Sequence, residues 1–225
     1  MSIKKNVSLI IIFFLIISCA GLILRGAEDE FEKGLALFNR GLYQEAIPHF
    51  EKAIEIDPEF ANAYLYLGRS HLNLKRWVEA VQPLRTAFRL SPEESKKEIV
   101  NLLIDALFGA AVYEIKQGNL QTSISFFKEV FSLQNQLDKS MDKLTENLLS
   151  LGGELLSEGK TTEAIAVYDE AVKVAPNNAT VYIGLARALL KNGDMLKAVD
   201  AIKNALEIDP SNSDAQFLFK NILGM

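Results

Sequence analysis

The amino-acid sequence repeats itself at an interval of 34 residues, and this period constrains the fold more than any other feature. Four pairs of identical residues in the first half follow the interval: Gly34 and Gly68, Ala46 and Ala80, Ala53 and Ala87, and Pro58 and Pro92. Five pairs follow it in the second half: Leu151 and Leu185, Gly159 and Gly193, Ala164 and Ala198, Ala171 and Ala205, and Pro176 and Pro210. A period of this length with helical patterning predicts a stack of helical hairpins.

The repeated residues have the properties that two closely packed helices need. Gly34 and Ala46 are small, which allows the two helices of one hairpin to approach each other, and Ala53 is small at the contact with the next hairpin. Gly41 suits the left-handed conformation that ends a helix. Asp57 precedes Pro58 and therefore avoids helical geometry, which predicts the end of the second helix.

The pattern resembles the tetratricopeptide-repeat family, and the resemblance covers nearly everything after residue 26. It implies an all-α fold, a right-handed superhelix of helical hairpins closed by a C-terminal capping helix. The expected repeats are 27–60, 61–94, 104–137, 145–178 and 179–212, with the capping helix at 213–225. The third repeat is degenerate, since Ser123 replaces the usual alanine and no proline closes it. A helix of about 25 residues is expected just before its turn, ending near Lys116.

The first 26 residues resemble a membrane-targeting segment and are excluded from the fold. Lys4 and Lys5 precede an apolar stretch, and Ile16-Ile17-Ser18-Cys19 resembles the bacterial lipobox, which predicts lipid attachment at Cys19, the only cysteine. The apolar run 7–24 is also long enough for an uncleaved spanning anchor, and a plain cleaved signal is a third alternative. All three predict a folded part outside the cytoplasm, in a bacterial cell envelope.

Several classes of function are not expected from this sequence. The net charge is -5 and no basic stripe follows Lys5, which argues against nucleic-acid binding. One cysteine and two histidines, His49 and His71, provide no metal cluster. Phosphate-binding glycine loops and nucleophile motifs are not found, so we expect no enzyme activity, cofactor, metal or small-molecule substrate.

Recognition of a protein or peptide partner is therefore the expected function, because stacked hairpins form a concave groove lined by their first helices. The fifth position of each repeat and of the capping helix is apolar: Phe31, Leu65, Phe108, Leu149, Ile183 and Phe217. These residues could form a docking stripe, or they could pack between neighbouring first helices, and both interpretations remain open.

Polar groove candidates follow from the same register. They are Arg69 with Asn73, Arg187 with Lys191, and Tyr66; the alternative is a solubilising rim. The clamp that chaperone-binding members of the family use for a C-terminal carboxylate is not expected, since its positions hold Phe31, Leu35 and Leu65.

The sequence as a whole predicts a membrane-anchored interaction scaffold. A lipidated cysteine followed by a repeat array is similar to pilotins and to outer-membrane assembly lipoproteins, which implies a role in assembling a pilus, secretion or outer-membrane complex. The alternative is an inner-membrane-anchored adaptor or regulator of cell-wall enzymes.

Overall fold

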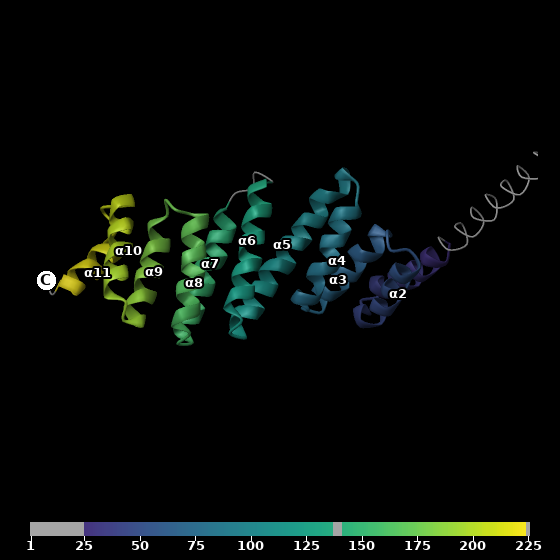
Figure 1. Cartoon of the computed structure of the whole chain (residues 1–225), viewed down its shortest axis with the longest axis horizontal. Helices are drawn as coiled ribbons and strands as arrows, with labels where there is room; N and C mark the ends of the chain where they lie inside the picture. The colour runs from purple at the N-terminus through teal and green to yellow at the C-terminus, as the bar shows by residue number, and fades with distance from the viewer. Residues whose placement is uncertain (1–24, 137–140, 224–225) are drawn as a thin grey trace, which may run out of the picture. The chain divides into compact units, whose positions relative to one another are not determined.

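The computed structural model describes residues 25–136 and 141–223, which form α-helices joined by short connections, with no β-strand in these two ranges (Figure 1). Residues 25–39 are helical. They are followed by α2 (Tyr43–Ile56), α3 (Ala61–Asn73), α4 (Trp77–Leu90), α5 (Glu93–Lys116), α6 (Leu120–Gln136), α7 (Asp142–Ser157), α8 (Thr161–Val174), α9 (Ala179–Asn192), α10 (Met195–Ile208) and α11 (Ser213–Leu223). The predicted all-α fold is confirmed.

Membrane attachment concerns a part of the chain that the structure does not describe. Cys19 and the apolar run 7–24 lie outside the described residues. Within the described ranges, none of the helices combines the length and the apolar character that a membrane crossing requires.

The chain divides into two compact units, with unit 1 ending at Ala106 and unit 2 beginning at Leu107. The boundary lies inside α5, a helix of 24 residues that occupies the place of the long helix expected from the sequence. In unit 1, α2 packs on α3 and α3 packs on α4. In unit 2, the helices α7 to α11 each pack on the next, and α6 also packs on α8.

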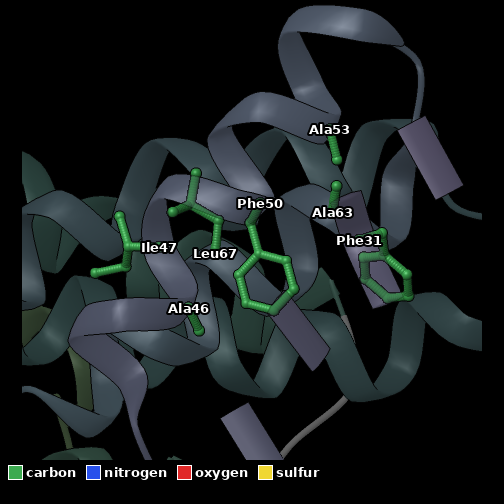
Figure 2. Close-up of a cluster of buried hydrophobic side chains, with 7 residues drawn as sticks. All are labelled: Phe31, Ala46, Ile47, Phe50, Ala53, Ala63 and Leu67. Atoms are coloured by element: carbon green, nitrogen blue, oxygen red, sulfur yellow. The ribbon is translucent and has the colours of Figure 1, made fainter. Parts of the chain in front are cut away.

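The repeated alanines mark the places where helices touch. All eight are completely buried: Ala46, Ala53, Ala80, Ala87, Ala164, Ala171, Ala198 and Ala205. In unit 1, Ala46 and Ala53 belong to a core that also contains Phe31, Phe50 and Leu67 (Figure 2). A Cβ atom on Gly34 would lie 2.7 Å from the Phe50 ring, so the predicted close approach at this glycine is confirmed.

The turns inside the hairpins share one backbone conformation. Gly41 has a φ of +77°, as predicted for a left-handed cap. Its counterparts are Gly118, Gly159 and Gly193, but the second repeat has Lys75 there, with a φ of +57°. A residue with a side chain is strained in this region, so Lys75 adopts a backbone conformation that lysine normally avoids.

Ser123 in the degenerate repeat is accommodated by a hydrogen bond. Its side chain is completely buried at the position where the other repeats have alanine. The hydroxyl donates to the main-chain oxygen of Ala111 at 2.8 Å. Because the buried hydroxyl is satisfied, serine can replace alanine without an uncompensated polar group.

Candidate functional site

A hollow of about 440 Å³ lies on unit 2, among the first helices of its last repeats. Its lining consists of Leu149 from α7, Tyr168 from α8, Thr180, Ile183, Gly184 and Arg187 from α9, and Asn212, Ser213 and Asp214 at the start of α11. Three of these residues, Leu149, Ile183 and Arg187, were predicted groove residues. The structure therefore brings these three predicted residues together around one cavity.

The apolar floor of the hollow is largely shared with the core of unit 2. Ile183 is only 4% exposed and belongs to a cluster with Ala179, Ala205 and Ala215. Leu149 is half-buried. A ligand in the hollow would contact the edges of these side chains, while most of their surface already stabilises the fold.

Tyr168 enters the hollow through a slot between two helices. A Cβ atom on Gly152 of α7 would lie 2.5 Å from the Tyr168 ζ-carbon, and one on Gly184 of α9 would lie 2.3 Å from a ring carbon. The two glycines thus make room for a ring that comes from α8. The side chain is 5% exposed, and no described residue hydrogen-bonds to its hydroxyl. Burial raises the pKa of Tyr168, while the nearby charge of Arg187 acts in the opposite direction.

Arg187 supplies the positive charge of the hollow and is already engaged in an ion pair. Its Nη2 atom donates to Oδ2 of Asp214, in the first turn of α11, at 2.8 Å. The two side chains are 53% and 58% exposed, so water screens this pair. Lys191, the predicted partner of Arg187, binds elsewhere, because its Nζ atom donates to the main-chain oxygen of Leu156 at 2.6 Å, near the end of α7.

Unit 1 contains a similar group of side chains on α3. The guanidinium of Arg69 lies 5.1 Å from the centre of the Tyr66 ring and 5.6 Å from that of Phe38, which are cation–π distances. Its Nη1 atom is 3.9 Å from Oε1 of Glu98 on α5. Leu65, which precedes Tyr66 in the sequence, is half-buried.

Asn73, the other polar candidate in unit 1, does not join Arg69 at its charged end. Its amide donates to the main-chain oxygen of Arg69 at 2.8 Å, one turn back along the same helix. The exposed amide therefore binds its own helix in this structure.

The two arginines occupy the same position, the ninth, of their repeats, and each pairs with an acidic residue of a later helix. Each unit also places a tyrosine near its arginine, but from different helices. Tyr66 lies at the sixth position of its repeat, where Gly184 stands in the last repeat. Tyr168 was not among the residues predicted from the sequence. Two sequence features point to it: Gly184 at the sixth position of the last repeat, and a tyrosine in the fourth repeat at the position that Phe50 has in the first repeat.

The predicted apolar stripe is not uniformly exposed. Phe31 is 7% exposed, and its ring centre lies 5.0 Å from Phe60 and 5.5 Å from Tyr66. Phe108 is half-buried, 5.7 Å from Phe127. Phe217, in contrast, is 64% exposed. Phe31 and Ile183 are therefore packing residues. Among the six residues of the predicted stripe, only Phe217 is largely open to solvent.

The histidines do not form part of these sites. Nδ1 of His49 lies 2.9 Å from Oε2 of Glu30, and Nδ1 of His71 is buried with no partner in the described part of the chain. In the same part, no group of histidine, cysteine and acidic residues is arranged to hold a metal ion.

Comparison with known proteins matches both units to models of the same protein family. Two tetratricopeptide repeat family models match, one over residues 31–95 and one over residues 155–222. Stress-induced-phosphoprotein 1 of Caenorhabditis elegans is 25% identical over 199 residues, which cover 80% of this chain and 62% of that protein. BBSome complex member bbs-4 of the same species is 27% identical over 192 residues, which cover 85% of this chain and 40% of that protein.

The chain thus spans less than two thirds of the length of either relative. Among solved structures, YrrB, described as a TPR protein with an unusual peptide-binding site, aligns with 85% of this chain and 90% of its own. That alignment has 19% sequence identity and a TM-score of 0.39.

Proposed function

Because the chain belongs to the tetratricopeptide-repeat family, we propose that it is an interaction scaffold that holds a peptide segment of a partner protein against its first helices. The observation that carries this proposal is the hollow on unit 2, which is lined by α7, α9 and the start of α11. The volume of about 440 Å³ is in the range of ligand sites, and six of the nine lining residues carry polar side chains that can orient a bound peptide.

The lining residues favour binding over catalysis. They include no histidine, cysteine or lysine, and the one carboxylate among them, Asp214, pairs with Arg187 and with no hydroxyl of the lining. Hydroxyl groups, one arginine and an apolar floor are instead suited to holding an extended peptide by its main chain and one or two side chains.

Filling the hollow with a bulky side chain tests this proposal. Thr180 is exposed on the lining, and Thr162 is exposed on α8 outside it. Full-length protein in detergent is used to select binders from a displayed library of random peptides. We expect Thr180→Trp to abolish enrichment, because the indole occupies the hollow, and the matched Thr162→Trp to retain it, with equal melting temperatures. Equal enrichment by both variants would place peptide binding elsewhere or nowhere on this protein.

The proposed location is the bacterial cell envelope, with the scaffold anchored to a membrane by its N-terminal segment. Support comes from the sequence: Lys4 and Lys5, the apolar run, and the lipobox-like residues that end at Cys19. In this setting the scaffold would assist assembly of a pilus, secretion or outer-membrane complex. The apolar residues Leu22, Ile23 and Leu24 after Cys19 favour a second candidate, an uncleaved inner-membrane anchor on an adaptor or regulator of cell-wall enzymes.

Mass spectrometry of the mature N-terminus separates the two candidates. The lipoprotein form predicts an acylated Cys19 as the first residue, loss of acylation in Cys19→Ala, and normal acylation in the control Ser18→Ala. An N-terminus at Met1 with unmodified Cys19 in the native host would exclude lipidation and favour the spanning anchor.

A further inference from the structure

The hydroxyl of Tyr168 has no role in packing. The first repeat of this chain places Phe50 at the equivalent position, and its ring lies against Gly34 as the Tyr168 ring lies against Gly152. A phenyl ring therefore fits such a slot without an oxygen. The hydroxyl has no hydrogen-bond partner in the described chain and is not among its enclosed polar atoms. Because Tyr168 lines the hollow, its hydroxyl is available to a partner that is not part of the chain.

The lining of the hollow provides several further hydrogen-bond donors. The hollow also has the hydroxyls of Thr180 and Ser213 and the guanidinium of Arg187. Asn212 faces the start of α11, where its Oδ1 atom accepts from the main-chain nitrogen of Ala215 at 3.1 Å. A ligand group that accepts hydrogen bonds and carries negative charge fits this set, and a carboxylate meets both conditions.

Asp214 already presents such a carboxylate to Arg187. The oxygen lies 2.8 Å from Nη2, and both side chains are more than half exposed, so the pair is weak enough to open. A comparable arrangement occurs in unit 1, where Glu98 of α5 lies 3.9 Å from Arg69. In both units, an acidic residue of the chain thus occupies the place that an acidic ligand would take.

We propose that Tyr168 and Arg187 form a carboxylate-binding site in unit 2. In the free protein Asp214 pairs with Arg187, and a carboxylate of the peptide partner takes its place on binding. The inference rests on the proposed function, since it assumes that a peptide enters this hollow. It assigns the site to residues other than those of the family's carboxylate clamp, whose positions hold Phe31, Leu35 and Leu65.

The test begins with the same selection on full-length protein. We expect the enriched peptides to be rich in Asp and Glu. The best acidic peptide is then compared with a twin in which every Asp and Glu is replaced by Asn and Gln, each with a free or an amidated C-terminus. The site predicts that loss of the recognised carboxylate weakens binding about tenfold or more. The two end groups show whether that carboxylate belongs to a side chain or to the terminus.

Four variants test which side chains cause the preference for acidic peptides. Tyr168→Phe should weaken the acidic peptide several-fold, leave its amide twin unchanged and not lower the melting temperature. Arg187→Gln should abolish the distinction between the twins. Asp214→Asn should tighten binding of the acidic peptide, because the internal competitor is removed. Tyr182→Phe is the control, since Tyr182 lines a different hollow on unit 2.

The outcomes distinguish the inference from the proposed function. Selection of neutral peptides with equal affinity for both twins, or acidic binding that Tyr168→Phe and Asp214→Asn leave unchanged, would overturn the carboxylate site and keep the scaffold. Failure to enrich any peptide would overturn both.

Discussion

Two neighbouring glycines in α7 have opposite surroundings. A Cβ atom on Gly152 would overlap the Tyr168 ring, whereas one on Gly153 would meet no atom within 4 Å. Gly152 is buried and Gly153 is exposed. The first glycine is therefore required for helix contact, and the second only adds flexibility to the unfolded chain.

This contrast predicts opposite effects of the same substitution. Gly152→Ala should lower the free energy of unfolding by about 1 to 3 kcal/mol, because Tyr168 must move out of its slot. Gly153→Ala should raise it by about 0.5 to 1 kcal/mol, because alanine favours the helix. Urea unfolding measures both changes, and equal losses in the two variants would show that Tyr168 does not occupy the slot.

His71 carries a buried polar atom without a partner among the described residues. Its Nδ1 atom is enclosed on α3, and burial lowers the pKa of its ring, with Arg76 adding to this effect and Glu79 opposing it. A histidine with a lowered pKa binds its proton more readily in the unfolded chain. Its contribution to stability is therefore present above the unfolded pKa of about 6.5 and is lost as the pH falls toward the folded value.

Replacement of this histidine should reduce the acid sensitivity of the fold. Between about pH 7.5 and pH 5.5, the wild-type free energy of unfolding should decrease more than that of His71→Leu, which has no group to protonate. The leucine variant should also be at least as stable as wild type at the higher pH, because an unsatisfied buried nitrogen is removed. Parallel pH curves for the two proteins would refute this account of His71.

At the scale of helices, the exposure of an apolar residue depends on whether a further repeat covers it. Phe31 lies at the fifth position of the first repeat and contacts the rings of Phe60, at the end of that repeat, and of Tyr66 in the next. Phe217 lies at the same position of α11, the last helix described, and is exposed. The same sequence position is thus a core position within the array and a surface position at its described end.

Serine substitutions measure how this difference in burial affects stability. Phe31→Ser should cost about 3 kcal/mol or more, because a buried aromatic side chain is lost. Phe217→Ser should change stability by less than about 0.5 kcal/mol. The half-buried Leu65 and Phe108 should fall between these values in the same thermal melts. A large loss at Phe217 would mean that it is covered by another part of the protein.

At the scale of the whole molecule, the described chain forms two units whose boundary falls within α5. In a solenoid each repeat contacts only its neighbours, so a local change in stability fades with distance along the chain. Hydrogen exchange resolves such local differences helix by helix.

Matched overpacking variants test this behaviour. Ala46 and Ala164 are completely buried, the first in unit 1 and the second in unit 2. Each change to Leu should cost about 1 to 3 kcal/mol. Ala46→Leu should reduce amide protection mainly in α2 to α4, and Ala164→Leu mainly in α7 to α10. Equal loss throughout the described helices in both variants would show that the units unfold as one.

Part of the candidate site follows from the repeat register. Leu149, Ile183 and Arg187 lie on first helices at positions that the period specifies, and all three line the hollow. Lys191 has the same helix face as Arg187 but reaches the end of α7 instead. A long flexible side chain can choose between several acceptors, so its partner does not follow from its position in the repeat.

The sequence by itself determined the hairpins, their small contact residues and their turns, because these depend on local conformation and on a period that repeats with the chain. Tertiary structure alone decided that Tyr168 reaches a hollow bounded by α9 and α11, and that Asp214 pairs with Arg187 there. Such contacts join residues far apart in sequence. They depend on the space that Gly152 and Gly184 leave between packed helices, which no single segment encodes.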